Sequence, residues 1–197
     1  MSEAFFRLSF AILIVIIAAT RTYGNYIAGT LSATKRQKYD DGWITVALRP
    51  VSVVIVLSAL VYLIMPSWMA WSQITLPDWI RIAGIGFGGI SAALMAWVQQ
   101  TLHKNFSGQL SIREDHTLVT RGPYRWVRHP MYTATVLLFF SVFLITANWF
   151  IGIGGMLMVL AVIIHRTPKE EAMLTNTFGD AYKTYMQKTT RYIPFIF

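Results

Sequence analysis

Polar and ionisable side chains gather at two places in a chain that is otherwise strongly apolar. The first stretch, residues 108–132, ends in "RWVRHPMY", and the second, residues 165–194, begins with "HRTPKEE". An arginine guanidinium binds carboxylates through two parallel hydrogen bonds, and a carboxylate binds ammonium groups or hydroxyls. The two stretches together supply the side chains that a zwitterionic or acidic ligand needs: Arg128, His129, Tyr132, Arg166, Glu170 and Glu171.

The elements that must position these side chains are apolar helices. Of the 197 residues, 55% are hydrophobic and 13% are charged, whereas soluble domains carry about 25% charged residues. Five apolar runs approach the roughly 20 residues that a helix needs to cross a bilayer: 4–20, 43–65, 79–98, 131–147 and 149–164. We predict an all-α polytopic membrane protein with about five transmembrane helices, the last two a tight helical hairpin around Asn148, followed by a helical C-terminal tail. Residues 1–98 supply three helices, and residues 99–197 hold the hairpin and both polar stretches.

A hairpin brings its two ends together, so we expect residues 128–132 and 166–171 to be neighbours at the membrane surface. Each residue alone could be an interfacial anchor, a proline at a helix start, or a carboxylate at a helix N-terminus. Anchoring requires neither the Gly-Pro-Tyr turn at 122–124 nor a pair of glutamates. Arg166 and Glu170 share one helical face by their i, i+4 spacing, although we expect Pro168 to break that helix.

The positive charges predict the orientation of the chain. The loops 21–42 and 99–130 and the tail 165–197 hold most of the Lys and Arg, while Arg7 and Arg81 fall near the opposite face. Cytoplasmic loops carry such an excess, so we expect the N-terminus outside and the C-terminus in the cytoplasm. Basic loops at a membrane surface also explain the net charge of +8 more simply than a nucleic-acid partner does, and we expect none.

Two further patterns exclude other sites. "GIGFGG" at 84–89 lies inside an apolar run and not between a strand and a helix, so a dinucleotide site is not indicated; Gly84 and Gly88 instead predict close approach of another helix. The chain has no cysteine, which excludes disulfides and thiol catalysis. The histidines lack metal-ligand spacing, so we expect no metal site.

The sequence "HTLVTRGPYRWVRHPMYTA" followed by "RTPKEEAMLTNTFGDAYKTYMQKTTRYIP" resembles the isoprenylcysteine carboxyl methyltransferase family, within the wider group of membrane methyltransferases that includes phospholipid methyltransferases. The similarity covers about residues 105–197. It implies S-adenosylmethionine (AdoMet) as methyl donor and makes residues 99–197 the cofactor-binding and catalytic region. The donor contacts that the resemblance implies are Gln109, His116, Thr117, Leu118, Val119, Tyr124, His129, Pro130, Met131, Tyr132, Glu170 and Glu171.

The resemblance also implies that Arg166 lies on the acceptor side and that Arg166 and Glu170 are the catalytic pair. The acceptor that we expect is the carboxylate of a prenylcysteine-like substrate, a lipophilic small molecule or a prenylated peptide entering from the membrane lipids. A carboxylate is already ionised at pH 7 and needs placement more than a base. The small size favours a prokaryotic inner membrane.

Three alternatives remain open at this point. A lipid amine acceptor would need a proton acceptor, for which Glu171 or Tyr132 could serve. An NADPH-dependent membrane reductase could use Arg121, Arg125 and Arg128 to bind a phosphate. A non-enzymatic scaffold or carrier would be stabilised by neither cofactor.

Overall fold

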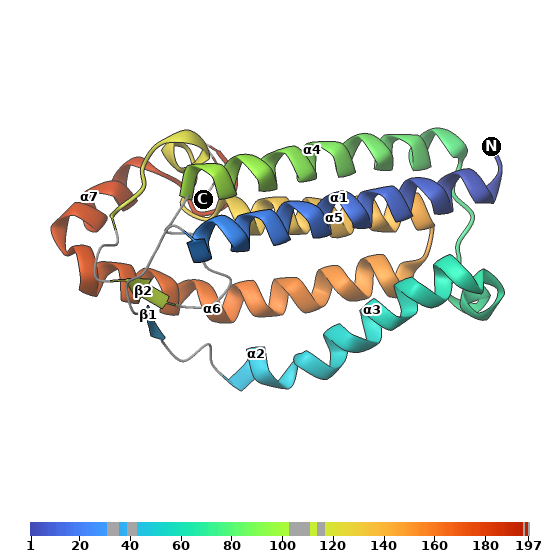
Figure 1. Cartoon of the computed structure of the whole chain (residues 1–197), viewed down its shortest axis with the longest axis horizontal. Helices are drawn as coiled ribbons and strands as arrows, with labels where there is room; N and C mark the ends of the chain where they lie inside the picture. Colours follow the sequence, from blue (N-terminus) through green and yellow to red (C-terminus); the bar gives the residue numbers. More distant parts are fainter. Residues whose placement is uncertain (31–35, 39–42, 103–110, 114–116, 195, 197) are drawn as a thin grey trace.

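The computed structural model describes residues 1–30, 36–38, 43–102, 111–113, 117–194 and 196. Helices dominate these residues, which confirms the predicted all-α class (Figure 1). A two-stranded antiparallel ribbon of β1 (Arg36–Lys38) and β2 (Ser111–Arg113) is a small addition. The helices are α1 (Glu3–Thr30), α2 (Trp43–Ala47), α3 (Arg49–Ile64), α4 (Asp78–Leu102), α5 (Pro130–Thr146), α6 (Gly155–Phe178) and α7 (Asp180–Lys188), with short turns at η1 (Pro66–Ser72), η3 (Gly122–Arg125) and η4 (Phe150–Gly154).

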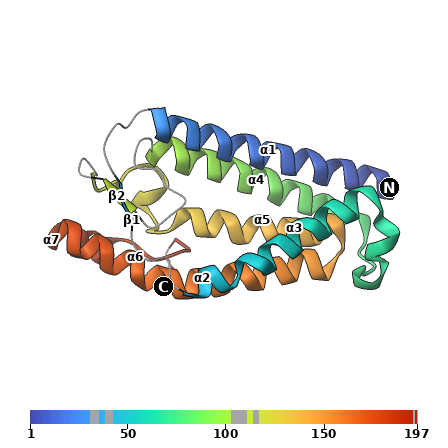
Figure 2. The same cartoon turned by 60° about the horizontal axis from the view of Figure 1, so that its bottom comes forward.

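The apolar helices account for the predicted spans. Four segments among the described residues are long and apolar enough to cross a membrane: Glu3–Ile27, Trp43–Ile64, Asp78–Leu102 and Phe150–Phe178. The fifth, Pro130–Thr146, is equally apolar but has 17 residues. All five run along the long axis of the molecule, with α3 crossing below the others at an angle (Figures 1 and 2).

The two glycines in α4 allow the close approach of α5 that the sequence predicts. A Cβ at Gly84 would lie 2.7 Å from the Cβ of Leu144, and one at Gly88 would lie 2.7 Å from the Oγ of Ser141. The Ser141 hydroxyl donates to the Gly84 carbonyl at 2.7 Å. Small residues let two helices pack closely and form hydrogen bonds in a membrane, so α4 and α5 form a closely packed pair.

The buried guanidinium of Arg81 holds the helices together at the end of the bundle near the N-terminus. The Arg81 guanidinium, on α4, donates to both carboxylate oxygens of Glu3 at 2.6 and 2.9 Å and to the Ile145 carbonyl at 2.8 and 3.0 Å. Ile145 lies in the last turn of α5, where carbonyls lack an intrahelical partner. Arg81 therefore ties α1, α4 and α5 together at the end farthest from the two polar stretches.

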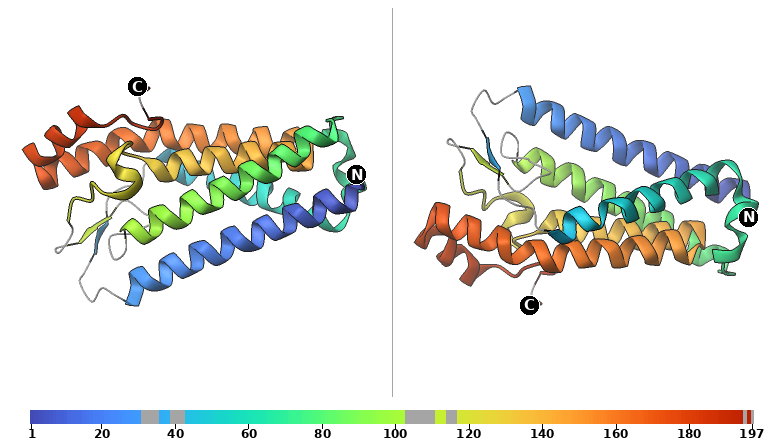
Figure 3. Two further views of the ribbon diagram at one scale, coloured as in Figure 1. Left: turned by 90° about the horizontal axis from the view of Figure 1, so that it is seen from above. Right: turned by 90° about the horizontal axis from the view of Figure 1, so that it is seen from below.

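The α5–α6 hairpin turns where predicted. Asn148 is fully buried; its side chain donates to the Ser72 hydroxyl at 2.7 Å and accepts the Ile151 N–H at 3.0 Å. The predicted break at Pro168 is wrong: α6 contains Pro168 and continues to Phe178. A proline inside a helix removes one hydrogen bond, but the side chains of the next turn are fixed by contacts to other elements, described below. The extended α6 thus continues past the N-terminal end of α5 (Figure 3). Residues 166–171 lie beside that end, where Tyr132 contacts Glu170.

Candidate active site

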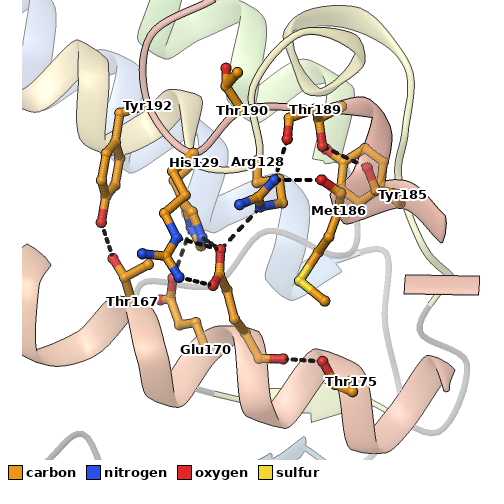
Figure 4. Close-up of polar contacts among 12 residues, drawn as sticks. Arg128, His129, Thr167, Glu170, Thr175, Tyr185, Met186, Thr189, Thr190 and Tyr192 are labelled. Atoms are coloured by element: carbon orange, nitrogen blue, oxygen red, sulfur yellow. Dashed lines mark hydrogen bonds and ion pairs between the residues drawn. The ribbon is translucent and has the colours of Figure 1, made fainter. Parts of the chain in front are cut away.

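The chain forms a polar cluster where α5 begins, at the end of the bundle opposite Arg81. Three segments meet there: the loop that leads into α5, the last turns of α6, and the tail after α7 (Figure 4). The Arg128 N–H donates to the Thr190 carbonyl and the His129 N–H to the Arg191 carbonyl, each at 2.9 Å. The tail is therefore bonded along its backbone to the residues that begin α5.

Glu170 faces α5. Its Oε1 accepts hydrogen bonds from the Tyr132 hydroxyl at 2.8 Å and from the Arg166 Nε at 3.0 Å. Its Oε2 lies 3.3 Å from the Nδ1 of His129. The predicted adjacency of residues 128–132 and 166–171 is thus confirmed, and the i, i+4 pair of Arg166 and Glu170 is in direct contact.

Glu171 faces the loop and the tail instead. Its Oε1 accepts from the Arg128 Nε at 3.0 Å, and its Oε2 accepts from the Arg191 Nη2 at 2.9 Å. Successive helical residues point about 100° apart, because a turn holds 3.6 residues. The two neighbouring carboxylates consequently have different arginine and tyrosine partners, and both also contact His129.

His129 lies between these carboxylates and is 6% exposed. Burial lowers the pKa of its imidazole, but the contacts with Glu170 and Glu171 outweigh burial and raise that pKa above the usual 6.5. The Nε2 is 3.4 Å from Oε1 of Glu171, an ion-pair distance without the alignment of a hydrogen bond. The ring stacks on Tyr132 with a centroid distance of 5.5 Å. When the imidazole is protonated, its charge balances one of the two carboxylate charges.

Two further tyrosines lie near the cluster, Tyr124 half-buried and Tyr182 buried. Burial raises the pKa of Tyr124, in η3, and of Tyr182, in α7, so both stay protonated. The Tyr185 hydroxyl donates to the Tyr124 carbonyl at 2.6 Å, which fixes α7 on η3. The Tyr182 side chain is 1% exposed, and its hydroxyl has no hydrogen-bond partner within the described part of the chain.

The structure brings together many but not all of the predicted site residues. Gathered at the cluster are Tyr124, His129, Pro130, Tyr132, Arg166, Glu170 and Glu171, with Met131 in the first turn of α5. Thr117, Leu118 and Val119 lie in the irregular segment before η3, and Gln109 and His116 lie outside the described residues. No group of three His, Asp or Glu side chains among the described residues could hold a metal ion.

Sequence reasoning missed four residues of this region: Thr167, Tyr182, Arg191 and Tyr192. Thr167 is buried and accepts the Tyr192 hydroxyl at 2.8 Å. One signal was present for Tyr182, because Tyr182 and Tyr185 recur at i, i+3 on an otherwise polar segment, a spacing that indicates one buried face. The tail residues carry no comparable pattern.

Comparisons with family models, curated proteins and solved structures all indicate the same family. Residues 85–176 match the model of the isoprenylcysteine carboxyl methyltransferase (ICMT) family. Among curated proteins, protein-S-isoprenylcysteine O-methyltransferase of Homo sapiens is 28% identical over 128 residues, which are 64% of this chain and 45% of that protein. The Schizosaccharomyces pombe enzyme is 34% identical over 83 residues, 42% of this chain and 35% of that protein. The Arabidopsis thaliana enzyme B is 28% identical over 120 residues, 60% of this chain and 61% of that protein.

A solved structure shows the same arrangement of helices. The structure of the eukaryotic intramembrane Ras methyltransferase ICMT matches with a TM-score of 0.59 and 26% identity, covering 75% of this chain and 53% of that one. The chain spans about half the length of the first of these curated relatives and of the solved structure. The family match runs from α4 to α6 and includes the cluster residues that those elements carry. The predicted resemblance is confirmed: the chain is a multi-pass integral membrane protein related, through residues 85–176, to the isoprenylcysteine carboxyl methyltransferase family.

Proposed function

We propose that this protein is a membrane methyltransferase that moves a methyl group from AdoMet to the carboxylate of a prenylcysteine-like acceptor. The observation that carries the proposal is the charged cluster of His129, Tyr132, Arg166 and Glu170, which lies at the end of the α5–α6 hairpin. These residues fall within the segment that matches the family model.

The residues present fit the donor. AdoMet presents an ammonium, a carboxylate and hydroxyls, and supplies an activated methyl group on a sulfonium when bound. Glu170 is a mostly buried carboxylate suited to the ammonium or the hydroxyls. The buried Nε2 of His129 and hydroxyl of Tyr182 have no aligned partner in the part of the chain described, and buried polar groups normally have one. A polar ligand that reached these atoms would satisfy them.

We propose the donor contacts that the resemblance implies. The set comprises Gln109, His116, Thr117, Leu118, Val119, Tyr124, His129, Pro130, Met131, Tyr132 and Glu170, with Glu171 contributing to the same site. Residues 99–197 would then form the donor-binding and catalytic region. Residues 1–98 would supply the helices that embed it in the bilayer.

Arg166 is the residue that we propose for the acceptor. It lies one helical turn before Glu170 and is held by that carboxylate through its Nε. An acceptor carboxylate is ionised at pH 7 and can pair with a guanidinium in a planar fork. Transfer then requires placement of this carboxylate in line with the methyl group and exclusion of water, and no general base.

We also propose the orientation that the basic loops indicate, with the N-terminus outside and the cluster facing the cytoplasm. A reporter that is active only outside the cytoplasm, fused after Phe197, should give no signal. The same reporter placed before Ser2 should be active. Activity of the C-terminal fusion would overturn the orientation.

The function is tested first by ligand stabilisation. Purified protein in detergent should show a higher Tm with AdoMet or its demethylated product and an unchanged Tm with NADPH. A ligand at 100 times its Kd stabilises the folded state by about 2.7 kcal/mol. Stabilisation by NADPH alone would favour the reductase and overturn the proposal.

The acceptor is tested with methyl-labelled AdoMet and matched substrates. An S-farnesylated cysteine analogue with a free carboxylate should accept label in base-labile form. The same compound with its carboxylate blocked as an amide should accept none. Labelling of phosphatidylethanolamine with no labelling of the free acid would replace the carboxylate by a lipid amine.

A further inference from the structure

We propose that Arg191 is a positioning residue for the donor site, and that residues 189–192, called here the tail strap, form one wall of that site. In this arrangement Glu171 contributes to donor binding through the strap and not by direct contact. The inference rests on the proposed function and adds to it the division of labour between Glu170 and Glu171.

The strap is fixed first by its backbone. Thr190 and Arg191 accept the N–H groups of Arg128 and His129 at 2.9 Å, and Val127 and Thr190 form a parallel bridge. His129 precedes Pro130, the first residue of α5. The strap therefore fixes the main chain of His129, whose side chain contacts both carboxylates.

The strap also joins the two helices of the hairpin. The Thr133 hydroxyl, on α5, donates to the Tyr192 carbonyl at 2.6 Å. The Tyr192 hydroxyl donates to Thr167, on α6, at 2.8 Å. Displacing the strap would break contacts with α5 and α6 together, next to the residues that we assign to the donor.

Glu171 is the ionic anchor of this strap. Arg191 contacts it through Nη2 at 2.9 Å and Nε at 3.3 Å, and Arg128 contacts it through Nε at 3.0 Å. Arg128 also donates to the carbonyls of Met186 and Thr189, at the end of α7. These carbonyls lack helical partners, so one carboxylate links α6, the loop before α5, and the chain that leads into the strap.

The partners of the two carboxylates explain why we separate their roles. Glu171 is shared by two guanidiniums, and a ligand ammonium would have to displace one of them. Arg191 is half exposed, with 50% of its side chain accessible, whereas the carboxylate it contacts is 10% exposed. The guanidinium of Arg191 thus lies over Glu171 at the solvent side of the cluster.

The test compares Arg191→Ala, Arg191→Lys and the control Lys188→Ala, which changes an exposed cation on α7. AdoMet affinity is measured by calorimetry, and hydrogen exchange of residues 127–129 is measured without donor. Because half-exposed ion pairs are screened by solvent and contribute little, we expect Arg191→Ala to weaken AdoMet binding by roughly two- to fivefold. Exchange at 128 and 129 should rise, while the KM for the acceptor stays unchanged.

The lysine variant separates positioning from general destabilisation. Arg191→Lys keeps one charge near Glu171 and should restore part of the affinity and of the exchange protection, since lysine lacks the fork. Lys188→Ala should match wild type in both. Wild-type affinity and wild-type exchange in Arg191→Ala would overturn the inference. If wild type itself does not bind AdoMet, the proposed function fails, while the exchange data still decide whether Arg191 holds the strap.

Discussion

Replacing Glu170 with glutamine should weaken AdoMet binding while leaving the fold intact. The change keeps the shape of the side chain and removes its charge. Tyr132 and Arg166 both donate to Oε1, so the amide oxygen of glutamine should take that place. The amide nitrogen would then face the Nδ1 of His129, which in wild type is 3.3 Å from a carboxylate oxygen. Two donors facing each other cannot form a hydrogen bond.

The expected loss of AdoMet affinity is estimated from a contact between the ligand and a side chain at position 170 that has lost its charge. A hydrogen bond to a charged group contributes about 1.5–3 kcal/mol, which corresponds to a roughly ten- to hundredfold weaker Kd for AdoMet at 25 °C. The Kd is measured by calorimetry in detergent, after a thermal melt has shown that the variant is folded. Lys183→Gln is the matched control, because Lys183 is exposed and pairs with Asp180, away from the cluster. Equal AdoMet affinity in wild type and folded Glu170→Gln would remove Glu170 from the donor site.

Four other outcomes are expected. Arg166→Ala should lower turnover strongly with little change in AdoMet affinity. Arg166→Lys should restore only part of the turnover, because an ammonium lacks the planar fork. Normal turnover of the alanine variant would make Arg166 a membrane anchor. His129→Ala should lower AdoMet affinity more than it lowers turnover. A larger loss of turnover than of AdoMet affinity would contradict the assignment of His129 to the donor. Since the pKa of His129 is raised in the folded protein, its contribution to stability should be complete below about pH 6.5 and decline as the pH rises through the folded pKa; a Tm that is flat between pH 6 and 9 would refute this. Gly152→Ala should destabilise by about 1–3 kcal/mol, since its Cβ would lie 2.4 Å from the Cα of Phe143. Gly86→Ala meets nothing within 4 Å and removes a glycine from the interior of α4, so it should not lower the Tm.

The features that could be predicted from the sequence are those that depend on a local pattern of residues. The polar Asn148 between two apolar runs marks the hairpin, and a short turn forces its helices to be antiparallel, so residues 128–132 and 166–171 had to meet. Gly84 and Gly88 on α4 indicated a close helix contact, which α5 provides. In each case the cause lies within a few residues of the signal.

The features that were missed depend on contacts between distant segments. Local preference predicts a break at Pro168, yet Glu170 and Glu171 bond to side chains of α5, the loop and the tail, which hold the helix together. The path of residues 189–192 depends on backbone partners about 60 positions earlier. The different partners of the two glutamates follow from their angle around the helix axis, which becomes evident only once α6 is known to continue past Pro168.

The unequal lengths of α5 and α6 explain why the polar cluster lies beside the start of α5. With a rise of 1.5 Å per residue, the 17 residues of α5 span about 26 Å, less than a bilayer core of about 30 Å. The 24 residues of α6 span about 36 Å and extend beyond the start of α5. The difference of about 10 Å is filled by the loop before α5 and by the tail strap, which bring Arg and His side chains to the carboxylates of α6. The short α5 thus lets the polar loop and the tail lie beside α6 within the length of its helix. In the methyltransferase that we propose, a water-soluble donor and a lipid acceptor would meet at this level.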